Sequence, residues 1–124
     1  MSHPNEDLLW GAYGMRNQGE VSGTRDLLRD DVVWHTLGGD VHGVDQVLAM
    51  LAQSDEIAAG SISREVHALF ANHEYGMVLV TVRAERQGRR FEDRQVHVYR
   101  FRDGRIAEFW FFPGDRRANE EFWS

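Results

Sequence analysis

Two histidines stand where their side chains could do acid–base chemistry. His35 lies in the run "DVVWHT" and His97 in the run "VHVYRFRDGRIAEFWFF", in both cases among aromatic and β-branched residues. An imidazole has an ordinary pKa of about 6.5, so its neutral form accepts a proton and its charged form donates one near neutral pH. An apolar surrounding also strengthens any hydrogen bond made to a developing oxyanion. We therefore take these two histidines as candidate catalytic residues.

Other common catalytic chemistries find no support in the chain. It has no cysteine, which excludes disulfides, thiolate metal ligands and cysteine nucleophiles. It also has no glycine-rich phosphate loop, no GxSxG nucleophile motif and no HExxH zinc helix. Asp40 and His42 follow His35 closely, but nothing in their spacing enforces a metal geometry. We expect neither a metal nor a cofactor.

The composition is that of an ordinary globular domain. The chain has 124 residues, with 14 basic and 20 acidic side chains, and the net charge of -6 opposes non-specific attraction to nucleic acid phosphates. No segment approaches the ~18 consecutive apolar residues of a membrane span, and the N-terminal "MSHPNED" does not resemble a signal peptide. We expect one domain over residues 1–124, a cytoplasmic location, and neither a nucleic acid nor a membrane as partner.

The first half of the chain has mainly helical patterns. Apolar residues recur at three- and four-residue spacing over residues 4–18 and predict an amphipathic helix. A short helix over residues 22–30 and a third helix over residues 44–54 follow the same pattern. Between them, the β-branched and aromatic residues of 32–36 predict a strand, and residues 37–43 read as a loop.

After Gly60 the apolar pattern changes to a period of two. Four long strands are predicted over residues 61–72, 75–88, 89–104 and 105–114, and short loops between them favour an antiparallel meander. Residues 115–124 predict about one helical turn. Helices followed by strands indicate the α+β class. Because both faces of the strands carry bulky apolar groups, we expect the helices to cover one face and a second copy of the chain to cover the other, as a homodimer.

The register of the last hairpin decides which residues face His97. A two-residue turn at Asp103-Gly104 would place His97 opposite Trp110. A three-residue loop with Gly104 as a bulge would place His97 opposite Phe109. Tyr99 and Phe101 share a face with His97 in both cases, because side chains alternate along a strand.

The chain as a whole resembles a known superfamily. The order of elements, the "RDLLRDDVVWH" run, the "VYRFRDGRIAEFWFFPGD" hairpin and the closing "EEFWS" resemble the nuclear transport factor 2-like superfamily, particularly its SnoaL-like branch, which is related to polyketide cyclases and ketosteroid isomerases. The resemblance implies a cone-shaped α+β barrel, in which a strongly curved antiparallel sheet wraps around three helices and a pocket opens at one end. This scaffold hosts isomerases, cyclases, hydrolases, dehydratases and non-enzymatic binding modules.

The same resemblance suggests roles for single residues. In the steroid isomerases one carboxylate abstracts a proton and a second acidic group donates a hydrogen bond to the enolate. His35 falls at the first position and His97 at the second, so both expected carboxylates are histidines here. Tyr13 lies near the tyrosine of the isomerases' first helix. The comparison favours the bulged hairpin, with Phe109 and Phe111 in the pocket.

These observations lead to one functional hypothesis and one rival. We expect the pocket to bind a small, mostly apolar molecule and to isomerise, cyclise or hydrate it without a cofactor, with His35 as base and His97 as acid or hydrogen-bond donor. Both histidines should then point into one cavity. The substrate-binding residues are expected to be Tyr13, Tyr99, Phe101, Phe109 and Phe111, and the dimer face should hold Glu108, Trp110 and Phe112. The rival is a non-catalytic ligand-binding or dimeric association module with a vestigial pocket.

Overall fold

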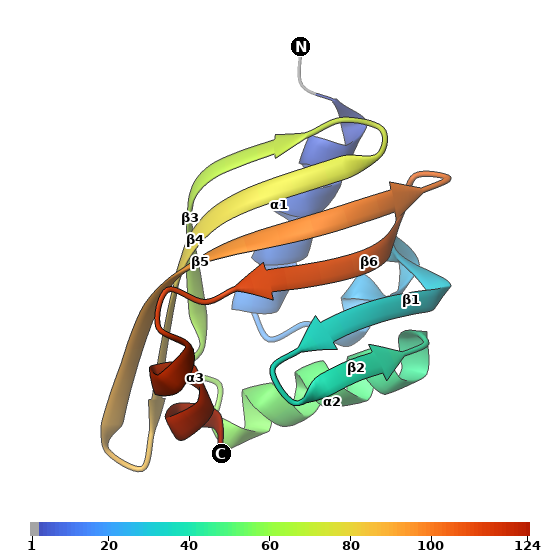
Figure 1. Cartoon of the computed structure of the whole chain (residues 1–124). Coiled ribbons are helices and arrows are strands. Elements are labelled where there is room, and N and C mark those ends of the chain that lie inside the picture. The colour runs from blue at the N-terminus through green and yellow to red at the C-terminus, as the bar shows by residue number, and fades with distance from the viewer. Residues whose placement is uncertain (1–2) are drawn as a thin grey trace.

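A computed structural model describes residues 3–124 of the chain. Its elements follow one another as α1 (Pro4–Asn17), the 3₁₀ helix η1 (Ser22–Leu27), β1 (Leu28–Thr36), β2 (Gly39–His42), α2 (Val44–Ile57), β3 (Ser63–Ala71), β4 (Tyr75–Arg86), β5 (Arg89–Arg102), β6 (Arg105–Phe112) and α3 (Arg116–Trp123). Figure 1 shows a strongly curved sheet with α1 against its concave face, α2 beside β1 and β2, and α3 near the far end of β5. The predicted α+β cone is confirmed.

Within residues 3–124, six strands form one open sheet in the order β2-β1-β6-β5-β4-β3. Adjacent strands are antiparallel, except for the parallel pair of β1 and β6. The sheet is therefore mixed and does not close into a complete barrel. The parallel pair is possible because most of the chain lies between these two strands, so no short hairpin fixes their relative direction.

Several boundaries differ from the sequence-based expectations. Residues 39–42, predicted as loop, form β2, because a two-residue turn lets Thr36 pair with Gly39. The first strand begins at Leu28 rather than residue 32, since Leu28 is buried and pairs with Ile106. The expected helical turn at the C-terminus is the eight-residue α3, which the Asp115 side chain caps by accepting a hydrogen bond from the Ala118 amide.

The core lies between the helices and the concave face of the sheet. Leu9 of α1 is fully buried, and it packs where Gly76 leaves room beside Phe101. A Cβ at Gly76 would lie 2.7 Å from the Leu9 Cδ1 atom. At the other end of the sheet Phe122 of α3 stacks on Phe91 with ring centroids 4.8 Å apart. These contacts fix α1 and α3 against the two ends of the sheet, so the residues between them form a rigid frame.

The hairpin between β5 and β6 has a register that neither prediction describes. Asp103 and Gly104 are the central residues of a two-residue turn, with φ values of 54° and 75°, and Arg102 pairs with Arg105. The positive φ at both positions defines the primed turn that matches strand twist. Further along, the register shifts by one residue, so that His97 pairs with Phe111 rather than with Phe109 or Trp110.

The shift comes from a β-bulge at Ala107. Arg100 pairs with Glu108 whereas Phe101 pairs with Ile106, so Ala107 is the extra residue on β6. The extra residue restores Phe109 to the inner face, where it is buried. The predicted division between inner and outer residues of β6 thus agrees with the structure, although the predicted cause was a bulge at the turn.

Within residues 3–124, no helix is long and apolar enough to cross a membrane.

Candidate functional site

A cavity of about 590 Å³ lies between the helices and the concave face of the sheet. Its walls come from every part of the fold, and the residues used below are Tyr13, Arg16, Trp34, Arg64, Gln95, His97, Tyr99, Phe109, Phe111 and Asn119. The volume lies in the range of pockets that hold small organic ligands. The lining is mostly apolar, and its polar side chains include several from α1, β3 and β5.

His97 is buried and has hydrogen-bond partners at both ring nitrogens. Its Nδ1 atom lies 2.5 Å from the Tyr13 hydroxyl, and its Nε2 atom lies 2.8 Å from Gln95 Oε1. The Tyr13 hydroxyl also lies 2.8 Å from the Tyr99 hydroxyl. These four side chains form a continuous hydrogen-bond chain along the inner face of β5 and onto α1.

The orientation of Gln95 fixes the tautomer of His97. Gln95 Nε2 donates to Asp93 Oδ2 at 3.2 Å and to Asn119 Oδ1 at 3.1 Å. The Gln95 oxygen is therefore the atom that faces His97, and it can only accept. His97 must then carry its proton on Nε2.

The proton on His97 Nε2 determines which groups donate in the hydrogen bonds among His97, Tyr13 and Tyr99. Burial, and then the positive charges of Arg64 and Arg16, lower the pKa of His97 to about 3, so the ring is neutral near pH 7. A neutral imidazole with a proton on Nε2 accepts at Nδ1, so the Tyr13 hydroxyl donates to it. Tyr13 has then used its one hydrogen and accepts from Tyr99. The Tyr99 oxygen is the free end of the chain.

Asp93 anchors the opposite end of this chain. Its two carboxylate oxygens accept hydrogen bonds from the backbone amides of Gly114 and Asp115, from Asn119 Nδ2 and from Gln95 Nε2. Four donors satisfy a buried carboxylate without a cationic partner. The turn into α3 thereby holds Gln95, and through it His97, in one orientation.

Both tyrosines are held in their neutral forms. Burial, together with the neighbouring Tyr99 hydroxyl, raises the pKa of Tyr13 well above its ordinary value. Burial likewise raises the pKa of Tyr99 to about 12. Near neutral pH each hydroxyl keeps its proton and acts as a hydrogen-bond donor. The Tyr99 hydroxyl can therefore donate to a ligand oxygen when it turns away from Tyr13.

His35 lines the edge of the cavity that His97 also lines, but its imidazole has different hydrogen-bond partners. Its Nδ1 lies 2.7 Å from Asp40 Oδ1 and its Nε2 lies 2.6 Å from Glu108 Oε2. Its ring stacks on Trp110, a residue of the outer face, with centroids 5.3 Å apart. His35 contributes to the cavity edge, but its imidazole is engaged by two carboxylates.

The outward direction of the His35 side chain follows from the burial of Trp34. Trp34 occupies the inner face and stacks on Phe109 with ring centroids 4.0 Å apart. Side-chain alternation then turns Val33 and His35 outward. The hydrogen bond with Glu108 raises the pKa of His35, although partial desolvation opposes the shift. This histidine belongs to an outer polar network that continues from Glu108 to Arg100.

The other expected pocket residues divide into two groups. Tyr13, Tyr99, Phe109 and Phe111 line the cavity. Phe101 is buried on the same face as His97 but lies outside the lining, because it fills the core beside Gly76. Phe101 is therefore a core residue in this structure.

The cavity residues that the sequence analysis missed include Arg16, Trp34, Arg64 and Gln95. A signal existed for Gln95, because it precedes His97 by two residues and so shares its face. Arg64 similarly alternates with apolar Val66 on β3 and with Ile62 just before the strand. Arg16 lies one helical turn after Tyr13. Trp34 required a choice between two faces that its short strand did not settle.

The chain belongs to the SnoaL-like domain family, which matches residues 12–109. Its relatives include the uncharacterized protein Rv0034 of Mycobacterium tuberculosis strain H37Rv, which is 30% identical over 91 residues. These residues represent 73% of this chain and 70% of that protein.

Solved structures agree with this assignment at the level of the fold. Bal32a, from a soil-derived mobile gene cassette, superposes with a TM-score of 0.91 at 22% identity and covers 98% of this chain and 97% of its own. TerC superposes with a TM-score of 0.81 at 19% identity, covering 97% of this chain and 98% of its own. The fold is that of the nuclear transport factor 2-like superfamily.

Proposed function

We propose that this SnoaL-like protein binds a small, mostly apolar molecule in its cavity and isomerises, cyclises or hydrates it by acid–base chemistry. The observation that carries the proposal is the hydrogen-bond chain from His97 through Tyr13 to Tyr99, which ends in an apolar cavity of about 590 Å³. The similarly folded TerC has been co-crystallized with polyporic acid, which supports small-molecule binding by this fold.

Tyr99 is the group that would touch the reacting oxygen of the ligand. Its hydrogen points to Tyr13, so its lone pairs can accept a hydrogen bond from a ligand hydroxyl. When the hydroxyl rotates, it donates to a ligand carbonyl, and the same donor stabilises the enolate that forms when a solvent water molecule takes up the α-proton. Tyr99 is thus the candidate catalytic residue. Tyr13 and His97 are positioning residues that act through it.

A non-catalytic binding module is the second candidate. Both ring nitrogens of His97 are occupied, and burial lowers the pKa of His97 to about 3. The neutral ring is consequently a weak proton acceptor near pH 7. In this alternative Tyr99 only recognises an oxygen of the bound molecule.

Hydrogen exchange into an enolisable ketone separates the two candidates. 2-Tetralone is small and apolar, and NMR in D₂O follows the exchange of its α-protons. Acid–base catalysis predicts that the protein accelerates this exchange, and that Tyr99→Phe removes the acceleration because the enolate loses its donor. Tyr75→Phe is the matched control, because Tyr75 lies exposed on β4 outside the cavity.

Chemical shifts of the protein supply the second measurement. Perturbation of cavity resonances by 2-tetralone without accelerated exchange would favour the binding module. Absence of both perturbation and acceleration would contradict a ligand pocket for such molecules.

A further inference from the structure

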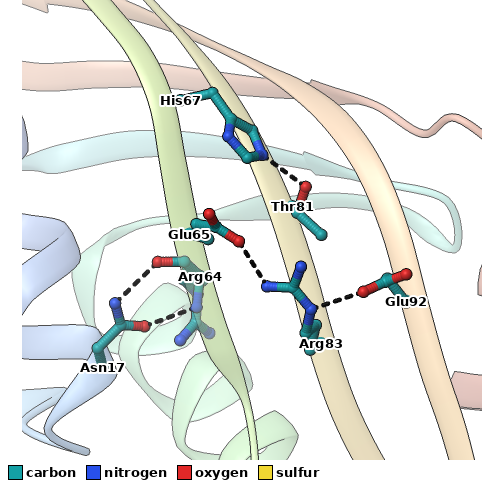
Figure 2. Close-up of polar contacts among 7 residues, drawn as sticks. All are labelled: Asn17, Arg64, Glu65, His67, Thr81, Arg83 and Glu92. Carbon is teal, nitrogen blue, oxygen red and sulfur yellow. Dashed lines mark hydrogen bonds and ion pairs between the residues drawn. The ribbon is translucent and has the colours of Figure 1, made fainter.

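Two arginines lie in the cavity wall close to the hydrogen-bond chain. Arg16 follows Tyr13 by one turn of α1, and Arg64 lies on β3. The side chain of Asn17 exchanges two hydrogen bonds of 2.9 Å with the backbone of Arg64, as Figure 2 shows. These bonds hold the end of α1 against β3 and so bring the two arginines together.

Strand alternation directs Arg64 to the cavity. Its neighbour Glu65 points to the outer face, where Figure 2 shows it paired with Arg83, which in turn binds Glu92. Arg64 consequently occupies the inner face, and only 9% of its side chain is exposed. Arg83 on the outer face is thus paired with carboxylates, whereas Arg64 on the inner face lines the cavity.

Among the residues that the structure describes, the two inner arginines form ion pairs with one carboxylate, that of Asp55. The Arg16 Nη2 atom lies 3.6 Å from Asp55 Oδ1, and the Arg64 Nη2 atom lies 4.0 Å from the same oxygen. Neither distance is that of a hydrogen bond. Two positive charges against one negative charge leave a surplus of one positive charge in a largely buried place.

The cluster of Arg16, Arg64 and Asp55 also contains buried polar atoms without hydrogen-bond partners. In the described part of the chain, four buried side-chain nitrogen or oxygen atoms have no hydrogen-bond partner, and three of them are Arg16 Nε, Arg64 Nη1 and Asp55 Oδ2. Native proteins rarely leave buried donors unpaired, because each costs the free energy of its lost hydration. The polar groups of the two guanidinium groups are thus incompletely satisfied within the protein. An anion bound where Arg16 and Arg64 line the cavity would balance their surplus charge.

We propose that the ligand of this cavity is a monoanionic carboxylic acid with an apolar ring, held by Arg16 and Arg64 through its carboxylate. This inference rests on the proposed function and narrows its substrate class. A carboxylate matches the surplus of one charge and the planar fork of a guanidinium. The ring of the ligand then lies toward Trp34 and Phe109, and an oxygen substituent on it reaches Tyr99.

Calorimetric titration with two probes of the same ring tests the charge. 2-Naphthoate carries a carboxylate at pH 7, and 2-naphthamide is its neutral analogue of similar shape. We expect the wild-type protein to bind 2-naphthoate about tenfold or more tightly than 2-naphthamide, since a charge-assisted hydrogen bond contributes at least this much. Arg64→Met and Arg16→Met should each remove about tenfold of the 2-naphthoate affinity and change 2-naphthamide affinity by less than about threefold.

Arg83→Met is the matched control variant. Arg83 lies on the strand next to Arg64 but on the outer face, so its loss should leave both affinities unchanged. If Arg64→Met does not fold, Arg64→Gln removes the charge and keeps a polar side chain, and the same affinity ratio is measured. As a further readout, 2-naphthoate should raise the Tm of the wild type more than that of either arginine variant.

The outcomes separate the two proposals. Equal affinity of the wild type for both probes, or equal losses for both in the arginine variants, would overturn the carboxylate inference and leave the proposed binding function standing. Failure of both probes and of 2-tetralone to bind would overturn the binding function itself.

Discussion

At the scale of single residues, the Tyr13 hydroxyl links His97 to Tyr99 in the hydrogen-bond chain. It donates to His97 and accepts from Tyr99, so it satisfies two other buried groups at once. Removing it leaves the Nδ1 atom of His97 and the Tyr99 hydroxyl without partners inside the protein. Removing the Tyr99 hydroxyl leaves only one acceptor position of Tyr13 empty.

This difference predicts unequal effects of two similar substitutions. Tyr13→Phe should lower the free energy of unfolding by about 1–3 kcal/mol, because buried groups lose their hydrogen bonds. Tyr99→Phe should lower it by about 0.5–1.5 kcal/mol. Denaturant unfolding measures both values, with exposed Tyr75→Phe as the control. A smaller loss for Tyr13→Phe than for Tyr99→Phe would contradict the deduced direction of the chain.

His97 gives the protein a specific dependence of stability on pH. Its pKa is about 3 in the folded state, against about 6.5 when unfolded. Between these values the unfolded chain binds the proton and the folded chain does not, so stability falls as the pH decreases from 6.5 toward 3. His97→Gln should remove this contribution, worth about 1.4 kcal/mol per pH unit within the window.

The measurement is the unfolding free energy of wild type and variant across this pH range. Their difference isolates His97 from other titrating groups, including His35, whose raised pKa acts in the opposite direction. His73→Gln is the control, because His73 lies exposed in the β3–β4 turn. A difference between wild type and His97→Gln that stays constant with pH would refute a neutral, buried imidazole.

Sequence alone could identify part of this site. The alternation of His97 and Tyr99 on a strand predicts their shared face, and the resemblance to SnoaL-like proteins points to Tyr13. His35 and His97 both line the cavity, and their joint catalytic role stays a prediction. The sequence did not indicate that the His35 ring contacts Asp40 and Glu108, because a strand pattern does not say which face is inner when Trp34 and His35 compete for it. The burial of a large aromatic ring decides that competition, and the partner ring of Phe109 becomes visible only in the structure.

At the scale of elements, the bulge at Ala107 determines the lining of the cavity. The turn at Asp103-Gly104 alone would place Phe109 and Phe111 on the outer face. The extra residue reverses this assignment for everything that follows it on β6. A bulge inside a strand has no sequence signature comparable to a glycine in a turn, which is why neither predicted register was correct.

Deletion of Ala107 should therefore reverse β6. The apolar rings of Phe109 and Phe111 would lose their inner positions, and the unfolding free energy should fall by at least about 3 kcal/mol, the usual loss for one buried phenylalanine. The control inserts one glycine at the Gln87-Gly88 turn, where a longer surface loop should cost about 1 kcal/mol. Equal stability of both variants would show that the bulge does not fix the strand.

At the scale of the whole molecule, the outer face of the sheet carries an apolar surface. Two cross-strand rows of side chains run over β3, β4, β5 and β6, namely Phe70, Met77, Val98 and Trp110 in one and Ala68, Leu79, Val96 and Phe112 in the other. Four of these residues are exposed: Phe70, Met77, Leu79 and Phe112. Such a surface supports our proposal of a homodimer through this face.

Sedimentation at micromolar concentration tests the dimer. We expect the wild type to sediment as a dimer, and Met77→Lys and Phe112→Lys to sediment as monomers, because each places a charge in an apolar interface. Trp10→Lys is the control, since Trp10 is exposed on α1 away from the sheet's outer face. A monomeric wild type would refute the proposal.

The position of β6 between β1 and β5 also has a consequence for the order of folding. The strands β3, β4, β5 and β6 form hairpins with their neighbours in the chain, and β1 forms one with β2. In the described residues, the β1–β2 hairpin joins the other strands through β6, where Trp34 pairs with Phe109. Closing so long a loop is slow compared with forming hairpins. We therefore expect the N-terminal strands to dock after the β3–β6 meander has formed. On this order Trp34 and Tyr99 come together late, and the ligand cavity is completed after the meander.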